Sequence, residues 1–233
     1  MPDRIPLALC PGLLLDGRLW QHQIAALSDI ADIRVPDFTR HDSMQGFAEA
    51  VLEIMPQRFA LAGLSMGGSV AFEVMRQAPE RVSRLALMDC RAPVDPPEQA
   101  ARRRGFMELA KKGRFRGVTP QLLPVLIHPD RQKDQALTGL LMEMAEAIGR
   151  EAFLRQQTAL LTRPDNLPLL SWIDVPTIVV CGRQDALTPL FYAEEMAAGI
   201  RGSKLIVVED SGHLPPLEQP AEVNRILRDW LTA

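Results

Sequence analysis

The chain has 233 residues, of which 47% are hydrophobic and 24% are charged, and its net charge is −3 at pH 7. This length and apolar content allow one sizeable buried core and exclude a disordered chain or a coiled coil. Because charges of both signs are interspersed, we expect neither nucleic acid nor a membrane surface as a partner. The expected partner is a small-molecule substrate.

The N-terminus and the cysteines bear on the cellular compartment. The chain begins Met1-Pro2-Asp3-Arg4 and enters a short apolar run at once, which is unlike a secretion signal. It has no run of about 18 apolar residues. Cys10, Cys90 and Cys181 fall at or near the ends of expected strands, and an odd number of cysteines favours reduced, buried thiols. We therefore expect a cytoplasmic protein.

Short apolar runs alternate with segments of helical period along most of the chain. Runs bounded by Gly, Pro or Asp predict six strands, near residues 5–10, 32–35, 58–62, 84–88, 177–181 and 204–208. Helical patterns lie near residues 19–27, 43–55, 66–77, 190–198 and 221–231. The alternation predicts a doubly wound α/β fold, in which helices cover both faces of a mostly parallel sheet.

This alternation stops between Arg91 and Asp174. The stretch has no convincing strand, and its helical patterns lie near residues 97–112, 119–127, 131–148 and 151–162. A helical insertion between two strands of a parallel sheet is typical of a lid over the strand ends, where ligands bind. We therefore divide the chain into a core, residues 1–91 and 174–233, and an all-helical lid, residues 92–173.

The segment Gly63-Leu64-Ser65-Met66-Gly67 follows an apolar run and opens a helical pattern. A serine flanked by glycines on such a turn is typical of a nucleophile elbow, which lifts the hydroxyl clear of the backbone. Small residues at this spacing also occur where a helix merely packs closely on a sheet. The two explanations can be distinguished, because a nucleophile elbow also requires an acid and then a histidine, each just after a later strand.

Both residues are present. Asp185 follows the fifth expected strand and His213 follows the sixth. Because parallel strands share one C-terminal edge, these side chains can converge with Ser65. His213 would take the serine proton and return it to the leaving group, while Asp185 would orient the imidazole. Asp89, at the end of the fourth expected strand, is the alternative acid.

Acyl transfer also needs two backbone donors for the oxyanion. The N–H of Met66, directly after the serine, is one candidate, and the loop after the first strand should supply the other. Pro11 has no N–H and Gly12 gives the backbone freedom, so we expect the second donor to be the N–H of Leu13.

Together these motifs resemble the α/β-hydrolase family, and within it the small, lidded bacterial carboxylesterases. The resemblance covers about residues 5–231 outside the lid, and it implies two-step ester hydrolysis through an acyl-enzyme without a metal or cofactor. The family usually has His-Gly where this chain has Pro11-Gly12 and an antiparallel strand pair ahead of the first strand, so we expect a truncated sheet edge. The motifs are the Gly-containing loop after the first strand, Gly63-Leu64-Ser65-Met66-Gly67-Gly68, Asp185 in a Gly-x-x-Asp-x-x-x-Pro setting, and Ser211-Gly212-His213 ahead of Glu218-Gln219-Pro220.

Several reactions of this family keep a serine at position 65. We favour the hydrolysis of carboxylic esters, including thioesters, of small to medium acyl groups. A C–C bond hydrolase or a menaquinone-pathway-type lyase is the second hypothesis, and a ligand receptor with very slow turnover is the third. An intact set of Ser65, Asp185 and His213 favours catalysis over the receptor.

The expected lid bears on the substrate through charge and apolar surface. Residues 91–116 carry eight basic and three acidic side chains, which favours an anionic substrate, such as an acidic acyl group or a thioester of a carrier protein or coenzyme A. A solvated helix face would explain the same charges. Apolar lid residues supply both packing and an acyl pocket. The substrate-binding candidates are Gly12, Leu14, Leu123, Leu126, Ile127 and Leu214.

Overall fold

The computed structural model describes residues 4–233, which form one six-stranded sheet. The strand order is β2-β1-β3-β4-β5-β6, and all five pairings among the described strands are parallel. The predicted doubly wound α/β fold is confirmed. The strands are β1 (Ile5–Cys10), β2 (Ala31–Arg34), β3 (Phe59–Leu64), β4 (Val82–Met88), β5 (Thr177–Gly182) and β6 (Lys204–Val208).

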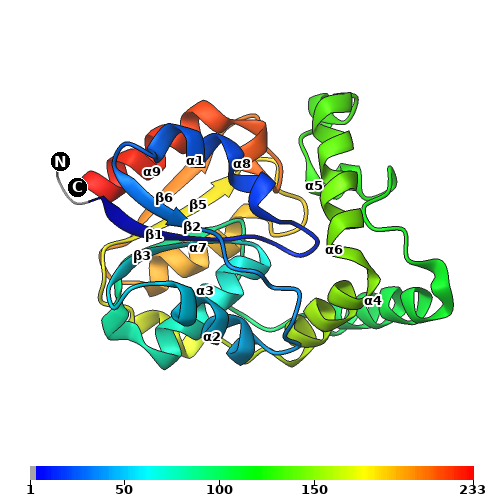
Figure 1. Cartoon of the computed structure of the whole chain (residues 1–233), viewed down its shortest axis with the longest axis horizontal. Helices are drawn as coiled ribbons and strands as arrows, with labels where there is room; N and C mark the ends of the chain where they lie inside the picture. Colours follow the sequence, from blue (N-terminus) through cyan, green and yellow to red (C-terminus); the bar gives the residue numbers. More distant parts are fainter. Residues whose placement is uncertain (1–3) are drawn as a thin grey trace.

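Helices cover both faces of the sheet (Figure 1). Every residue of β3 and β5 is buried, because a parallel sheet between two helix layers has no face toward water. Each face accordingly packs into a hydrophobic cluster of its own. One cluster holds side chains of α1 (Gln21–Leu27), α8 (Pro215–Glu218) and α9 (Pro220–Thr232), and the other holds side chains of α2 (Met44–Ile54), α3 (Met66–Gln77) and α7 (Leu190–Gly199).

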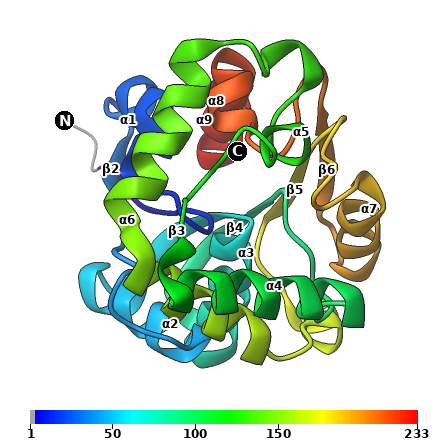
Figure 2. The ribbon, with the colours of Figure 1, turned by 90° about the vertical axis from the view of Figure 1, so that its right-hand side faces the viewer.

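The segment between β4 and β5 is a helical insertion, which lies beside the sheet in Figure 1 and in front of it in Figure 2. It contains α4 (Pro97–Leu109), α5 (Leu123–Leu126) and α6 (Gln135–Thr162). The two helices expected at 131–148 and 151–162 form the two halves of α6, which are separated by Gly149, whose φ of 75° and ψ of 174° are not helical. The expected helix 119–127 is reduced to the single turn α5, because Pro120 and Pro124 have no N–H to extend it.

The second half of α6 is anchored to the core. Ala159 and Leu160 pack in the same hydrophobic cluster as α2 and α3. The insertion is therefore fastened to the core along the C-terminal half of α6. Among the described residues, no helix is both long and apolar enough to cross a membrane.

The strand order determines where a site can form. The chain passes from β1 to β2 on one side and then returns to β3 on the other side of β1. In open parallel sheets, ligands bind beyond the carboxyl ends of strands at such a reversal. The loop after β1 and Ser65 after β3 both lie at this point.

Candidate active site

Ser65 occupies the turn between β3 and α3. Its φ of 57° lies in the left-handed region, which is strained for a residue with a side chain. Glycine is needed two residues later, because a Cβ at Gly67 would collide with the carbonyl of Cys10 at the end of β1. Since α3 begins directly after the serine, the side chain of Ser65 lies at the positive end of a helix of 12 residues.

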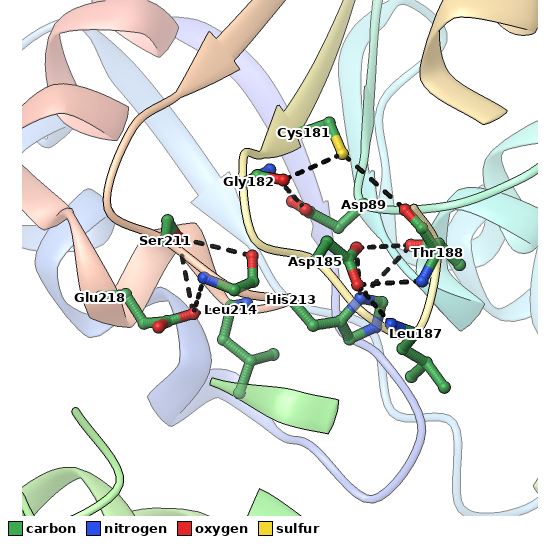
Figure 3. A network of polar contacts seen from close by, with 11 residues as sticks. Asp89, Cys181, Gly182, Asp185, Leu187, Thr188, Ser211, His213, Leu214 and Glu218 are labelled. Carbon is green, nitrogen blue, oxygen red and sulfur yellow. Dashed lines mark hydrogen bonds and ion pairs between the residues drawn. The ribbon is translucent and has the colours of Figure 1, made fainter. Parts of the chain in front are cut away.

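Asp185 and His213 contact each other in the loops after β5 and β6 (Figure 3). Asp185 Oδ2 lies 2.8 Å from His213 Nδ1, and both side chains are buried. The carboxylate also accepts hydrogen bonds from the N–H groups of Leu187 (2.8 Å) and Thr188 (2.9 Å), and from Thr188 Oγ1 (2.6 Å). With Nδ1 donating its proton to this fixed carboxylate, Nε2 carries the free lone pair of the imidazole.

The two buried aspartates near this site have opposite electrostatic environments. Burial alone would raise the pKa of Asp185, but the charge and hydrogen bond of His213 and the hydrogen bonds of Thr188 hold it below its usual value. Burial, followed by the charge of Asp185, holds the pKa of Asp89 well above its usual value. Asp89 Oδ1 accepts a hydrogen bond from the N–H of Gly182 at 2.8 Å. Within residues 4–233, His213 pairs with Asp185 rather than with Asp89.

Ser65 and His213 line the same cavity, which has a volume of about 530 Å³. His213 Nε2 is buried and has no hydrogen-bond partner in the described chain. No hydrogen bond joins it to Ser65 Oγ among the described residues. Catalytic contacts are often long in ligand-free enzymes and tighten only when substrate binds, so the shared cavity is the informative observation.

The two residues predicted to supply oxyanion donors, Met66 and Leu13, both line the cavity that contains Ser65. Met66 is the first residue of α3, so its N–H has no acceptor within the helix. Leu13, in the loop after β1, lines the cavity together with Ser65. A Cβ on Gly12 would lie only 3.3 Å from Ser65 Cβ, which shows how closely this loop approaches the serine.

The loop after β1 is supported by Gln156 of α6, a residue that our sequence analysis missed. Its Oε1 accepts a hydrogen bond from the N–H of Leu14 (3.1 Å), and its Nε2 donates to the carbonyl of Phe38 (3.2 Å). Gln156 is fully buried, and Leu14 has a φ of 60°, a conformation that needs such support. Nothing in the spacing of a glutamine along a long helix marks this contact.

Glu218, also missed as a site residue, holds the loop that carries His213. Its Oε1 accepts hydrogen bonds from the N–H groups of Gly212 and Leu214, each at 3.0 Å. Its Oε2 accepts one from the N–H of His128 in the insertion (2.6 Å). The histidine loop and the insertion are therefore fastened together. The Glu-Gln-Pro sequence after the histidine was the signal available for this contact.

The cavity divides the six substrate-binding candidates. Leu14, Leu126 and Leu214 line it. Leu123 and Ile127 do not line it, although they pack in the same hydrophobic cluster as Leu14 and Leu214. The backbone of Ile127 packs against the glycine at 212. Gly12 contributes through its backbone, because the absence of a side chain lets this loop lie close to Ser65.

One group of potential metal ligands occurs among the described residues, formed by Asp89, Cys181 and Asp185. Its carboxylate oxygens are already engaged within the protein, because Asp89 Oδ1 accepts from the N–H of Gly182 and Asp185 accepts four hydrogen bonds. Burial raises the pKa values of the Asp89 carboxyl and the Cys181 thiol. Cys10 and Cys90 are likewise buried free thiols with raised pKa values.

A parallel α/β sheet with a serine on a strained strand-to-helix turn, which lines the same cavity as the histidine of a buried Asp–His pair, is the architecture of the α/β hydrolases. Comparison with known families agrees, because the alpha/beta hydrolase family matches residues 7–226. The chain therefore belongs to the alpha/beta hydrolase family.

The similar proteins include two esterases and a lactonase. The chain is 28% identical over 199 residues to the pimeloyl-[acyl-carrier protein] methyl ester esterase of Neisseria meningitidis, covering 83% of this chain and 77% of that protein. It is similar to the solved, malate-bound esterase from Thermogutta terrifontis, with a TM-score of 0.87, 30% identity and coverage of 98% and 89%. It also shares its fold with the enol-lactonase from Burkholderia xenovorans LB400, with a TM-score of 0.83, 22% identity and coverage of 99% and 92%.

Proposed function

We propose that the protein is a carboxylic ester hydrolase with Ser65 as nucleophile, His213 as general base and acid, and Asp185 as the residue that orients the imidazole. The observation that carries this proposal is the hydrogen-bonded Asp185–His213 pair, whose free Nε2 belongs to a side chain in the same cavity as Ser65. The names of an esterase relative and an esterase structure support an ester as the bond that is cleaved.

The proposed reaction has two steps. In the first, His213 Nε2 takes the proton of Ser65 Oγ as the oxygen attacks the ester carbonyl, and Asp185 stabilises the resulting imidazolium. The N–H groups of Leu13 and Met66 donate to the oxyanion, and the imidazolium then protonates the departing alcohol. In the second step, His213 activates a water molecule that hydrolyses the acyl-enzyme and restores the serine.

The cavity sets the size of the proposed substrate. Its volume of about 530 Å³ lies within the usual range for small-molecule sites. We assign residues 92–173 to a lid, because α4, α5 and α6 supply much of the cavity wall. The substrate is a small to medium ester or thioester, and an acyl group carried by coenzyme A or a carrier protein would enter the same cavity.

The test combines an active-site label with a turnover assay. We expect a fluorophosphonate to modify Ser65, and Ser65→Ala to lower p-nitrophenyl ester turnover by at least about 10⁴-fold with an unchanged Tm. Ser203→Ala is the matched control, because Ser203 Oγ donates to the carbonyl of Ala197, and it should retain full turnover.

Three outcomes would contradict the proposal. Substantial turnover by Ser65→Ala would overturn the choice of nucleophile. A burst without steady-state turnover would favour a slow ligand receptor. Labelling of Ser65 without hydrolysis of any ester would favour a C–C bond hydrolase or lyase.

A further inference from the structure

Arginine is the charged residue of the cavity wall. No aspartate or glutamate of the described chain lines the cavity, and most of the remaining wall is apolar. A cavity with apolar walls and charges of one sign selects ligands of the opposite sign. The lining arginines are Arg91, Arg102, Arg103, Arg114, Arg116 and Arg163.

Three of these arginines converge on one carboxylate, that of Asp95. Arg103 Nε lies 2.5 Å from Asp95 Oδ2, Arg163 Nη2 lies 3.1 Å from Oδ1, and Arg91 Nη2 also contacts Oδ1. The side chains of Arg91, Arg163 and Asp95 are each 4% exposed, and that of Arg103 is 15% exposed. We call these four residues the arginine cluster. Three guanidinium groups facing one carboxylate leave two positive charges without a counter-ion in the cluster.

This excess charge is costly in a buried site. Burial, together with repulsion from Arg91 and Arg103, lowers the pKa of Arg163 to about 10 despite the attraction of Asp95. Burial likewise lowers the pKa of Arg103. Both side chains remain charged at neutral pH, and Arg163 Nε is buried without a hydrogen-bond partner in the described chain. Because a buried excess of one charge is destabilising, the cluster is suited to a second carboxylate.

The cluster lies close to the proposed nucleophile. Arg163 Nη1 donates a hydrogen bond to Ser69 Oγ at 3.0 Å. Ser69 follows Ser65 by four residues on α3, which is about 6 Å along a helix axis, and both serines line the cavity. A carboxylate bound by the cluster would therefore be separated from the reacting carbonyl by a short carbon chain.

We propose that the arginine cluster binds a carboxylate of the substrate, so that the preferred substrate is a monoester of a short dicarboxylic acid. This inference rests on the proposed function, because it names the substrate of the same site. The competing explanation is an ion cluster that only fastens the insertion to the core, since Arg103 lies on α4 and Arg163 directly follows α6.

The test compares two esters that differ only in charge, the mono-p-nitrophenyl ester of glutaric acid and the same ester with its free acid capped as a methyl ester. We expect the wild-type kcat/KM to be at least about tenfold higher for the charged ester, which is the usual effect of a charge-assisted hydrogen bond. Equal kcat/KM values for the two esters would overturn the inference.

Gln157→Glu is the sharpest variant. Gln157 lines the cavity, and its Oε1 accepts a hydrogen bond from Arg103 Nη1 at 2.9 Å. Glutamate has the same shape and places a carboxylate beside the cluster, so it should lower the charged-to-neutral ratio by about tenfold. Arg103→Met should also lower this ratio. Arg104→Met is the matched control, because Arg104 is an exposed neighbour on α4 that does not line the cavity, and it should leave the ratio unchanged.

A second readout does not depend on turnover. In Ser65→Ala protein, glutarate should raise the Tm more than glutaramide does, and Gln157→Glu should remove this difference. The inference would be overturned if Gln157→Glu left the charged-to-neutral ratio of kcat/KM unchanged and the two ligands shifted the Tm equally. The cluster would then only connect the insertion to the core. Hydrolysis of the neutral ester without any charge preference defeats this inference alone, whereas hydrolysis of neither ester defeats the proposed function as well.

Discussion

The sheet edge and the helical insertion contribute different groups to the same candidate site. The sheet edge supplies Ser65, Asp185 and His213, which lie in loops directly after strands. The insertion supplies Gln156, which supports the loop after β1, and Arg103, which lies in the wall. The groups proposed to react therefore come from one region, and the groups that support and surround them come from the other.

The two regions fix their side chains by different means. At the sheet edge, the backbone positions the side chains, as in the strained turn at Ser65 and the two N–H groups that donate to Asp185. In the insertion, contacts between side chains position them, as where Arg103 bonds to Asp95 and Gln157. Substitutions at the sheet edge should therefore remove a chemical step, whereas substitutions in the insertion should change the rate or the choice of substrate.

The largest effect should come from Asp185→Asn. The asparagine NH₂ can donate a hydrogen bond to Nδ1, which favours the tautomer with the proton on Nε2. Nε2 can then no longer take the serine proton, and kcat should fall by about 10⁴-fold. Steady-state kinetics with a p-nitrophenyl ester would measure this loss.

Asp89→Asn is the matched control for the acid. Burial raises the pKa of Asp89, His213 bonds to Asp185 instead, and asparagine tolerates the φ of 42° at this position. Activity should stay within about tenfold of wild type, because proton transfer does not pass through this residue. A loss of activity in Asp89→Asn as large as that in Asp185→Asn would contradict our choice of acid.

An intermediate effect should follow from Gln156→Leu. The change leaves the N–H of Leu14 without its buried acceptor and loosens the loop that carries the proposed oxyanion donor. We expect kcat to fall by about 10- to 100-fold with little change in KM, because only the transition state uses that donor. Thr158→Ala, whose hydroxyl bonds only within α6, is the control, and equal losses in both variants would refute a role for the amide.

The smallest effect concerns the pH dependence of stability. Burial would raise the pKa of Asp95, but Arg103, Arg163 and Arg91 together lower it below its usual value. Its contribution to stability is therefore present above the unfolded-state pKa of about 4 and is lost as the pH falls through the folded-state pKa. In a Tm series from neutral to acid pH, the curves of wild type and Asp95→Asn should converge on the acid side. Asp42→Asn, an exposed control, should run parallel to wild type, and parallel curves for Asp95→Asn would disprove the effect.

The sheet edge was more readily predicted than the insertion. Strand periodicity and the Gly-Leu-Ser-Met-Gly turn place Ser65, Asp185 and His213 at strand ends, because parallel strands share one edge whatever covers it. The contact between Gln156 and Leu14 joins residues 142 positions apart, and no local pattern encodes it. The sequence also shows that residues 91–116 are basic, but only the fold shows that Arg103 lines the cavity and Arg104 does not.

The amide of Gln156 has a consequence for protein engineering. It bridges the loops after β1 and β2 from a helix of the insertion. A chimera that exchanges residues 92–173 for the matching part of a relative would thus remove two hydrogen bonds that stabilise core loops, as well as much of the cavity wall. Libraries that randomise the insertion to obtain new substrate preferences should keep position 156 constant, so that variation in the cavity wall does not destabilise the core loops.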